Sequence, residues 1–145
     1  MNILCVCTGN VCRSPMLEAL LRREFQKEGF TDVTVSSAGT CTDDGMVPTT
    51  QAITAMQEIG IDIADHTSRQ LTPSIVDQND IFVALTTEHG VSLAFHYGVK
   101  PEKILVPGGG IADPFGYPLG AYRECREYLL ESLPELINDI KALWA

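Results

Sequence analysis

A short apolar run followed at once by a compact polar loop constrains this chain more than any other stretch of its sequence. The run Ile3–Val6 predicts a buried strand, Cys7–Pro15 predicts a tight loop, and apolar positions at helical spacing from Met16 to Phe25 predict a helix. Cys7 and Arg13 enclose a loop whose backbone amides can turn inward together. A loop of this kind in front of a helix N-terminus predicts a cradle for a tetrahedral dianion, and phosphate is its natural ligand.

The residue types inside the loop suit that geometry. Gly9 lacks a Cβ and Asn10 tolerates the left-handed region, so both favour the backbone in which successive N–H groups converge. Ser14 is predicted to cap the following helix, and Pro15 is compatible with its first turn. The predicted phosphate-binding residues are therefore Thr8, Gly9, Asn10, Val11, Cys12, Arg13 and Ser14.

Two side chains of this loop carry the predicted chemistry. Arg13 offers a planar, permanently charged fork that matches two phosphate oxygens at once. A free thiol is only about 3% thiolate at pH 7, but a helix N-terminus, converging amides and a neighbouring arginine favour the anion. We therefore interpret Cys7 as an activated nucleophile.

The whole string is more specific than the Cys-x5-Arg spacing alone. Cys7-Thr8-Gly9-Asn10-Val11-Cys12-Arg13-Ser14-Pro15 resembles the active-site signature of the low-molecular-weight protein tyrosine phosphatase family, which lies near the N-terminus in that family as it does here. The resemblance covers almost the full length of the chain. It implies a flavodoxin-like fold with a four-stranded sheet.

Length and composition limit the alternatives. At 145 residues with 45% hydrophobic content, the sequence predicts a single domain over residues 1–145. A net charge of -9 argues against nucleic acid or an anionic membrane as a partner. Five cysteines, no signal peptide and no apolar stretch long enough for a membrane span predict a cytoplasmic protein, and we expect a monomer.

Predicted strands and helices alternate along the chain. Further strands are expected at Val33–Ser36, Ile81–Leu85 and Lys103–Val106, and further helices at Thr49–Ile59, Ser74–Asp77, Glu88–His96 and from Leu119 onward, with strain near Pro134. The alternation of mostly apolar strands with helices predicts an open parallel α/β sheet. Ligands bind at the carboxyl ends of such strands, where the Cys7 loop is expected.

A phosphatase of this type also needs an acid, because the leaving group is poor until it is protonated. Asp113 lies in the Gly-rich loop beyond the last predicted strand, and Pro114 restricts the backbone that follows it. This pair matches the Asp-Pro motif of the family. By resemblance, Asp113 protonates the leaving group and then activates the water that hydrolyses the phosphocysteine.

Three further positions are assigned by resemblance. Ser37 and His66 match family residues that hydrogen-bond to the loop asparagine, here Asn10, and support its backbone. Cys12 matches a thiol that can form a reversible disulfide with the nucleophile, which would protect Cys7 from over-oxidation. The alternative for Cys12 is a small packed hydrophobe.

The walls of the site bear on the substrate. Thr8, Val11, Phe115 and Tyr117, with the loop Thr40–Pro48, are the predicted substrate pocket. The chain lacks the first-loop tryptophan and the adjacent aromatic pair of many tyrosine-directed members. It also resembles members that hydrolyse protein phosphoarginine and that carry threonine where this chain has Val11. Val11 favours phosphotyrosine, whereas Asp43 and Asp44 favour phosphoarginine.

Three other classes are disfavoured. Arsenate reductases share the fold and a similar loop but need a resolving cysteine pair, and residues 85–106 contain no cysteine. A silent phosphoprotein-binding module would not need Cys7, Arg13 and Asp113 together, and a flavodoxin-type electron carrier has no use for Cys7 and Arg13. We therefore predict a phosphatase that acts on phosphorylated proteins through a cysteinyl-phosphate, without metal or organic cofactor.

Overall fold

The computed structural model describes residues 1–144, and within this range the strands form one four-stranded parallel sheet. The strands are β1 (Asn2–Cys7), β2 (Thr34–Gly39), β3 (Ile81–Ala84) and β4 (Ile104–Leu105), in the spatial order β2-β1-β3-β4. β1 is central: Cys7 pairs in register with Gly39 of β2, and Val6 pairs with Ala84 of β3. The predicted parallel α/β sheet is confirmed.

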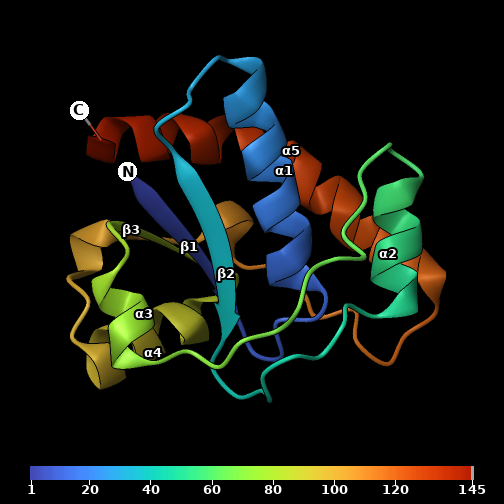
Figure 1. The fold of residues 1–145 in the computed structure, drawn as a ribbon, viewed down its shortest axis with the longest axis horizontal. Helices are drawn as coiled ribbons and strands as arrows, with labels where there is room; N and C mark the ends of the chain where they lie inside the picture. The colour runs from blue at the N-terminus through green and yellow to red at the C-terminus, as the bar shows by residue number, and fades with distance from the viewer. Residues whose placement is uncertain (145) are drawn as a thin grey trace.

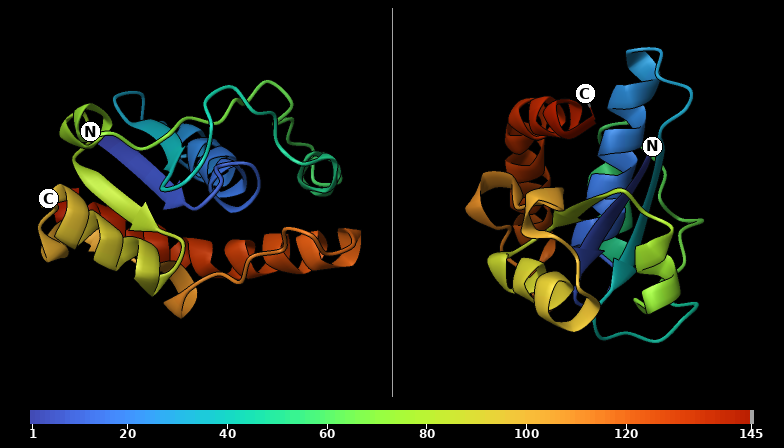
Figure 2. Two further views of the ribbon diagram at one scale, coloured as in Figure 1. Left: turned by 90° about the horizontal axis from the view of Figure 1, so that it is seen from below. Right: turned by 90° about the vertical axis from the view of Figure 1, so that its left-hand side faces the viewer.

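Helices cover both faces of this sheet (Figures 1 and 2). They are α1 (Arg13–Lys27), α2 (Thr50–Gln57), α3 (Pro73–Asp77), α4 (Thr87–Tyr97) and α5 (Leu119–Trp144), with short 3-10 turns η1 (Pro101–Lys103) and η2 (Pro107–Gly109). Within residues 1–144, none of these helices is long and apolar enough to cross a membrane.

Side chains alternate along β1 between two hydrophobic cores. Ile3, Cys5 and Cys7 join a core with residues of α1, α2 and α5, whereas Leu4 and Val6 join a second core with residues of α3 and α4. This alternation follows from the two-residue repeat of a strand, and a strand buried on both faces is apolar throughout. Burial on both faces fixes the carboxyl end of β1 firmly in the molecule.

Several predicted elements differ from the structure at their ends, whereas the predicted closing helix is present as one element. The strand expected at Lys103–Val106 is shorter, because Lys103 ends the turn η1 and only Ile104 and Leu105 pair with β3. Pro107 follows two residues after Leu105 and has no N–H to donate to a ladder. α5 continues through Pro134 as one helix, although that residue cannot donate the usual hydrogen bond to the preceding turn.

Candidate active site

The loop between β1 and α1 lies at the carboxyl edge of the sheet and forms the floor of a cavity. Cys7 ends β1 and is only 2% exposed, and Arg13 begins α1 and is 4% exposed. The cavity has a volume of about 450 Å³. It is lined by Cys7, Thr8, Gly9, Val11, Cys12, Arg13, Cys41, Thr42, Asp43, Met46, Asp113 and Phe115.

Asn10 holds the loop in shape from beneath. Its φ of 57° places it in the left-handed region, where no other non-glycine residue of 1–144 lies. Gly9 does not share this geometry, so the left-handed backbone that we expected at both positions falls on Asn10 alone. The Asn10 side chain is fully buried, and its Oδ1 accepts a hydrogen bond of 3.0 Å from the Arg69 backbone N–H.

The residues expected to support the loop meet at Asn10. Its Nδ2 donates to Ser37 Oγ at 2.9 Å and to Ser14 Oγ at 2.8 Å. His66 Nε2 lies 2.9 Å from the Asn10 carbonyl oxygen, which can only accept, so Nε2 carries the proton. Four protein groups therefore fix one strained residue, which is how a left-handed asparagine persists in a buried loop.

Ser14 does not cap α1, contrary to our prediction. The helix begins two residues earlier than that cap requires, at Arg13, with Cys12 at the N-cap position and no side-chain capping bond there. Ser14 instead lies in the first turn, with its Oγ 2.9 Å from Cys7 Sγ. Because Asn10 Nδ2 already donates to this oxygen, the Ser14 hydroxyl proton is available for the sulfur. The serine is thus placed to stabilise a thiolate rather than a helix end.

Arg13 is held by one firm hydrogen bond and keeps a donor open. One terminal nitrogen donates to the Ile111 carbonyl oxygen at 3.0 Å, and the other lies 3.5 Å from Asp113 Oδ2. Its Nε is buried and has no hydrogen-bond partner among residues 1–144. An unpartnered buried N–H costs about 1–3 kcal/mol, so a ligand oxygen in the cavity beside Arg13 would relieve that cost.

Asp113 reaches the cavity from the loop after η2. Its side chain is 49% exposed, and Oδ1 accepts a hydrogen bond of 3.1 Å from the Phe115 backbone N–H. The Cys12 thiol contacts the same oxygen at 3.8 Å. The Ile111 backbone N–H donates to the Leu85 carbonyl and ties this loop to the end of β3. The carboxyl is therefore oriented by a backbone N–H group, reaches the cavity and stays open to solvent.

The thiols near the site differ in their surroundings. Burial, then the proximity of Cys7 and Asp113, raises the pKa of Cys12 to about 12. Burial likewise raises the pKa of Cys125 to about 12, and Cys41 is exposed. Cys12 is therefore a neutral thiol at physiological pH, although it lines the same cavity as Cys7.

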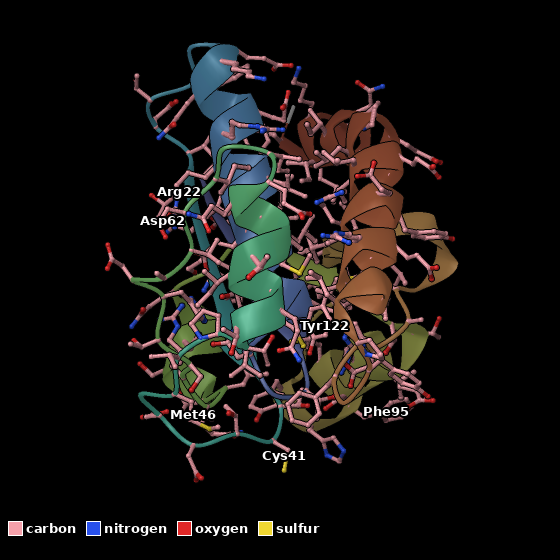
Figure 3. All side chains as sticks on the ribbon, turned by 90° about the vertical axis from the view of Figure 1, so that its right-hand side faces the viewer. Arg22, Cys41, Met46, Asp62, Phe95 and Tyr122 are labelled. Carbon is pink, nitrogen blue, oxygen red and sulfur yellow. The ribbon has the colours of Figure 1, made fainter. Side chains whose placement is uncertain are left out.

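Only some of the predicted wall residues reach the cavity. Thr8, Val11 and Phe115 line it, but Tyr117 does not; it lines a separate hollow of about 550 Å³ with Cys125 and Tyr128, behind the Asp113 loop. The loop after β2 contributes Cys41, Thr42, Asp43 and Met46, and Figure 3 shows Cys41 and Met46 on this loop. The loop was predicted, but nothing in its composition indicated which of its side chains face the cavity.

Sequence reasoning missed His89, which lies beside the loop. Its Nε2 is 2.9 Å from Thr8 Oγ1, and its Nδ1 is 2.8 Å from Thr86 Oγ1. The available signal was its position, because Thr86 and His89 directly follow β3 and so lie at the same sheet edge as Cys7. In the described part of the chain, no three His, Cys, Asp or Glu side chains group together as metal ligands.

Comparisons with known proteins agree with this geometry. A family model described as "Low molecular weight phosphotyrosine protein phosphatase" matches residues 2–143. A protein-arginine-phosphatase of Bacillus subtilis is 35% identical, with 97% of each chain covered. The probable low molecular weight protein-tyrosine-phosphatase EpsP of Ralstonia nicotianae is 32% identical, covering 98% of this chain and 97% of that one.

Other relatives widen the range of named activities. Arsenate reductase 2 of Staphylococcus haemolyticus is 31% identical over 87% of this chain and 88% of its own. Among solved structures, a mutant of the YwlE arginine phosphatase with a phosphorylated active-site serine is similar, with a TM-score of 0.88 and 33% identity. That comparison covers 97% of this chain and 96% of the other.

Proposed function

The chain belongs to the low molecular weight phosphotyrosine protein phosphatase family, and from this premise we propose that it hydrolyses protein phosphotyrosine through a cysteinyl-phosphate intermediate. One observation carries the proposal. The buried Cys7, hydrogen-bonded to Ser14, shares a cavity with Arg13, whose Nε is buried and unpartnered. A nucleophilic sulfur beside an open guanidinium donor suits a phosphoryl group.

In the first step, the Cys7 thiolate attacks phosphorus and forms the S–P bond while the bond from phosphorus to the phenolic oxygen breaks. Asp113, protonated at this stage, gives its proton to that oxygen, so the phenol leaves neutral. Arg13 and the loop amides stabilise the charge on the three remaining phosphoryl oxygens. The 3.5 Å separation of Arg13 and Asp113 places both groups at one end of the cavity.

In the second step, the carboxylate of Asp113 accepts a proton from water while the water oxygen attacks phosphorus. The S–P bond breaks, and its electron pair returns to Cys7 as thiolate. Inorganic phosphate leaves, and Asp113 is protonated again for the next cycle. Ser14 supports both steps, because a hydroxyl proton on the sulfur stabilises the departing thiolate.

Apolar side chains around the cavity favour an aromatic substrate. Val11 lines the cavity and is 7% exposed, and Phe115 and Met46 stand at its rim with 60% and 47% of their surface exposed. Such side chains can cover a phenol ring without leaving polar groups unpaired. A guanidinium group at the same place would need hydrogen-bond acceptors, which Val11 does not supply.

A second candidate substrate is protein phosphoarginine. Asp43 lines the cavity and could accept hydrogen bonds from a guanidinium group. The similar proteins named as arginine phosphatases give this candidate further weight. The mechanism would be unchanged, with a P–N bond breaking in place of the P–O bond and Asp113 protonating the leaving nitrogen.

The two candidates are tested by measuring phosphate release from a phosphotyrosine peptide and a phosphoarginine peptide in parallel, with EDTA present. We expect faster turnover of phosphotyrosine, and loss of activity on both peptides in Cys7→Ser. Faster turnover of phosphoarginine would overturn the substrate assignment but keep the mechanism. Turnover in Cys7→Ser at the native rate would overturn the mechanism itself.

Three further expectations concern arsenate reduction, the oligomeric state and the cellular location of the protein. Residues 85–106 contain no cysteine, so we expect no thiol-dependent arsenate reduction. We further propose a cytoplasmic monomer that meets phosphorylated proteins, because a nucleophilic thiol needs a reducing compartment. Light scattering after gel filtration tests the monomer, and cell fractionation tests the location.

A further inference from the structure

His89 is a buried ionisable group beside the active site that the proposed reaction leaves without a role. It lies in the first turn of α4 and is 7% exposed. Thr86, the N-cap residue of that helix, accepts a hydrogen bond of 3.2 Å from the His89 backbone N–H. The two ring nitrogens of His89 both contact hydroxyl groups, one from Thr86 and one from Thr8.

The hydroxyl partners favour one of the two neutral tautomers of the His89 ring. Thr86 Oγ1 accepts from the His89 backbone, and its own proton has only His89 Nδ1 as an acceptor among its contacts. A hydrogen on Nε2 leaves Nδ1 free to accept the Thr86 proton, whereas a hydrogen on Nδ1 would leave that proton without an acceptor. In the favoured tautomer, Nε2–H donates to Thr8 Oγ1 across 2.9 Å.

The surroundings keep this ring neutral. Burial, and next the positive charge of Arg13 on α1, lower the pKa of His89 to about 4. Two acidic groups act in the opposite direction, namely Glu88 on the same helix and Asp113 on the loop after η2. The imidazole is therefore uncharged at physiological pH, and a fixed tautomer can direct hydrogen bonds without adding charge to the cavity.

The bond from His89 leaves the Thr8 hydroxyl with one free donor. Thr8 is exposed and lines the cavity directly after Cys7. Its oxygen is occupied by Nε2–H, and its own proton has no other contact among residues 1–144. A side-chain donor fixed next to the nucleophile is available to a group bound in the cavity.

We propose that His89 is a positioning residue: its Nε2–H fixes the Thr8 side chain so that the Thr8 hydroxyl donates a hydrogen bond to an oxygen of the bound phosphate. The inference rests on the proposed function only in requiring that the cavity binds phosphate. Without His89, the Thr8 side chain could rotate among its staggered conformers, and binding would then include the cost of ordering it.

The first test concerns the proton on His89. Ring-nitrogen NMR of protein labelled with ¹⁵N-histidine distinguishes the two neutral tautomers and the charged form. We expect the Nε2–H tautomer at pH 7, with a change in the Nε2 signal in Thr8→Val. The Nδ1–H tautomer or a charged ring would overturn the assignment. This measurement needs no turnover, and the tautomer is assigned on the unmodified chain.

The second test measures the dissociation constant of inorganic phosphate by following backbone amide signals during a titration. We expect Thr8→Val and His89→Leu each to weaken phosphate binding by about 3- to 10-fold, the effect of one hydrogen bond. The double variant should be no more than about 2-fold weaker than either single variant, because both changes remove the same interaction. His89→Gln, which keeps a donor near the Nε2 position, should restore most of the affinity.

Matched controls separate positioning from stability. His96 is exposed in the last turn of the same helix, so His96→Leu should leave phosphate binding unchanged. The proposal is wrong if His89→Leu lowers the unfolding temperature but not the phosphate affinity. It is also wrong if the losses of phosphate affinity in Thr8→Val and His89→Leu add in full in the double variant. Because the probe is phosphate itself, failure here is distinguishable from failure to hydrolyse phosphotyrosine.

Discussion

Cys7 Sγ and Ser14 Oγ lie 2.9 Å apart, across the turn that joins β1 to α1. The Ser14 oxygen also accepts a hydrogen bond from Asn10 Nδ2. The single hydroxyl proton of Ser14 is therefore directed toward the sulfur. A hydrogen bond to a charged group contributes about 1.5–3 kcal/mol, more than one between neutral groups. The left-handed Asn10 and the nucleophile are thereby joined in one buried network.

Removal of the Ser14 hydroxyl should weaken the nucleophile. We expect Ser14→Ala to lower kcat/KM by about 10- to 100-fold, because the thiolate loses a donor to its charge. The rate of Cys7 alkylation by iodoacetate at pH 6 should fall in parallel. Ser74→Ala, on the exposed side of α3, is the control. Equal alkylation rates in the Ser14 variant and the native protein would contradict the role of this contact.

Loss of the acid should depend on the leaving group. We expect Asp113→Asn to slow hydrolysis of phenyl phosphate by about 10²- to 10⁴-fold, because an unprotonated phenolate must then leave. Hydrolysis of para-nitrophenyl phosphate should slow much less, since its leaving group is stable as an anion. Rates across a series of aryl phosphates measure this difference. A uniform loss across the series would argue against proton donation, and Asp139→Asn serves as the surface control.

The residue at position 11 should control the choice of substrate. Val11→Thr replaces a methyl by a hydroxyl at nearly constant volume within the cavity wall. We expect the ratio of phosphoarginine to phosphotyrosine turnover to rise by about 5- to 20-fold, because a hydroxyl can accept from a guanidinium. The measurement is kcat/KM on matched peptides. Val91→Thr, exposed on α4, should leave the ratio unchanged, and an unchanged ratio in Val11→Thr would remove the argument from Val11.

Cys12 should protect the nucleophile from oxidants. With its pKa raised to about 12, Cys12 stays a thiol, so peroxide should react first at the Cys7 thiolate. We predict that peroxide inactivation of the native protein is reversed by dithiothreitol, through a disulfide between Cys7 and Cys12. In Cys12→Ser, prolonged peroxide should cause irreversible loss. Mass spectrometry identifies the disulfide, and full recovery in Cys12→Ser would assign protection to another group.

Stability in acid should reflect the neutral His89. Its pKa is about 4 in the folded chain and about 6.5 when unfolded, so the unfolded state binds more protons between these values. The contribution of His89 is therefore complete above pH 6.5 and is lost as the pH falls to 4, by up to about 3 kcal/mol. We expect the unfolding temperature to fall less from pH 7 to 4.5 in His89→Gln than in the native protein. An equal fall would show that His89 is not buried as a neutral group.

Local patterns were sufficient to predict most of the architecture. The strand Ile81–Leu85 and the helix from Leu119 followed from apolar periodicity, and the parallel sheet followed from the alternation of strands and helices. Element ends were less well predicted, as in the shortened β4 and the start of α1 at Arg13. Ends depend on hydrogen bonds to other parts of the chain, which periodicity does not contain.

For the site, too, some residues could be found from the sequence, whereas some of their contacts appear only in the structure. Cys7, Arg13 and Asp113 were singled out because residue type and spacing limit what a nucleophile, an anion-binding group and an acid can be, and the structure brings all three to one cavity. Ser14, predicted as a helix cap, proved to be a partner of the sulfur, and His89 was indicated only by its position after a strand of the sheet. Both roles arise from contacts between separate elements.

The sequence by itself determined the family of the protein: its signature loop follows a buried strand, Asp113 lies on a later loop, and the apolar patterns bring both to one sheet edge. Only the tertiary structure decided that Asn10 and not Gly9 takes the left-handed backbone, that His89 rather than a loop neighbour contacts Thr8, and that Tyr117 lies outside the cavity. The physical reason is the distance along the sequence over which each kind of interaction acts. Periodicity and motif spacing are encoded by neighbours in the chain, whereas the direction of a hydroxyl or the facing of a loop side chain is fixed by packing against residues far away in sequence.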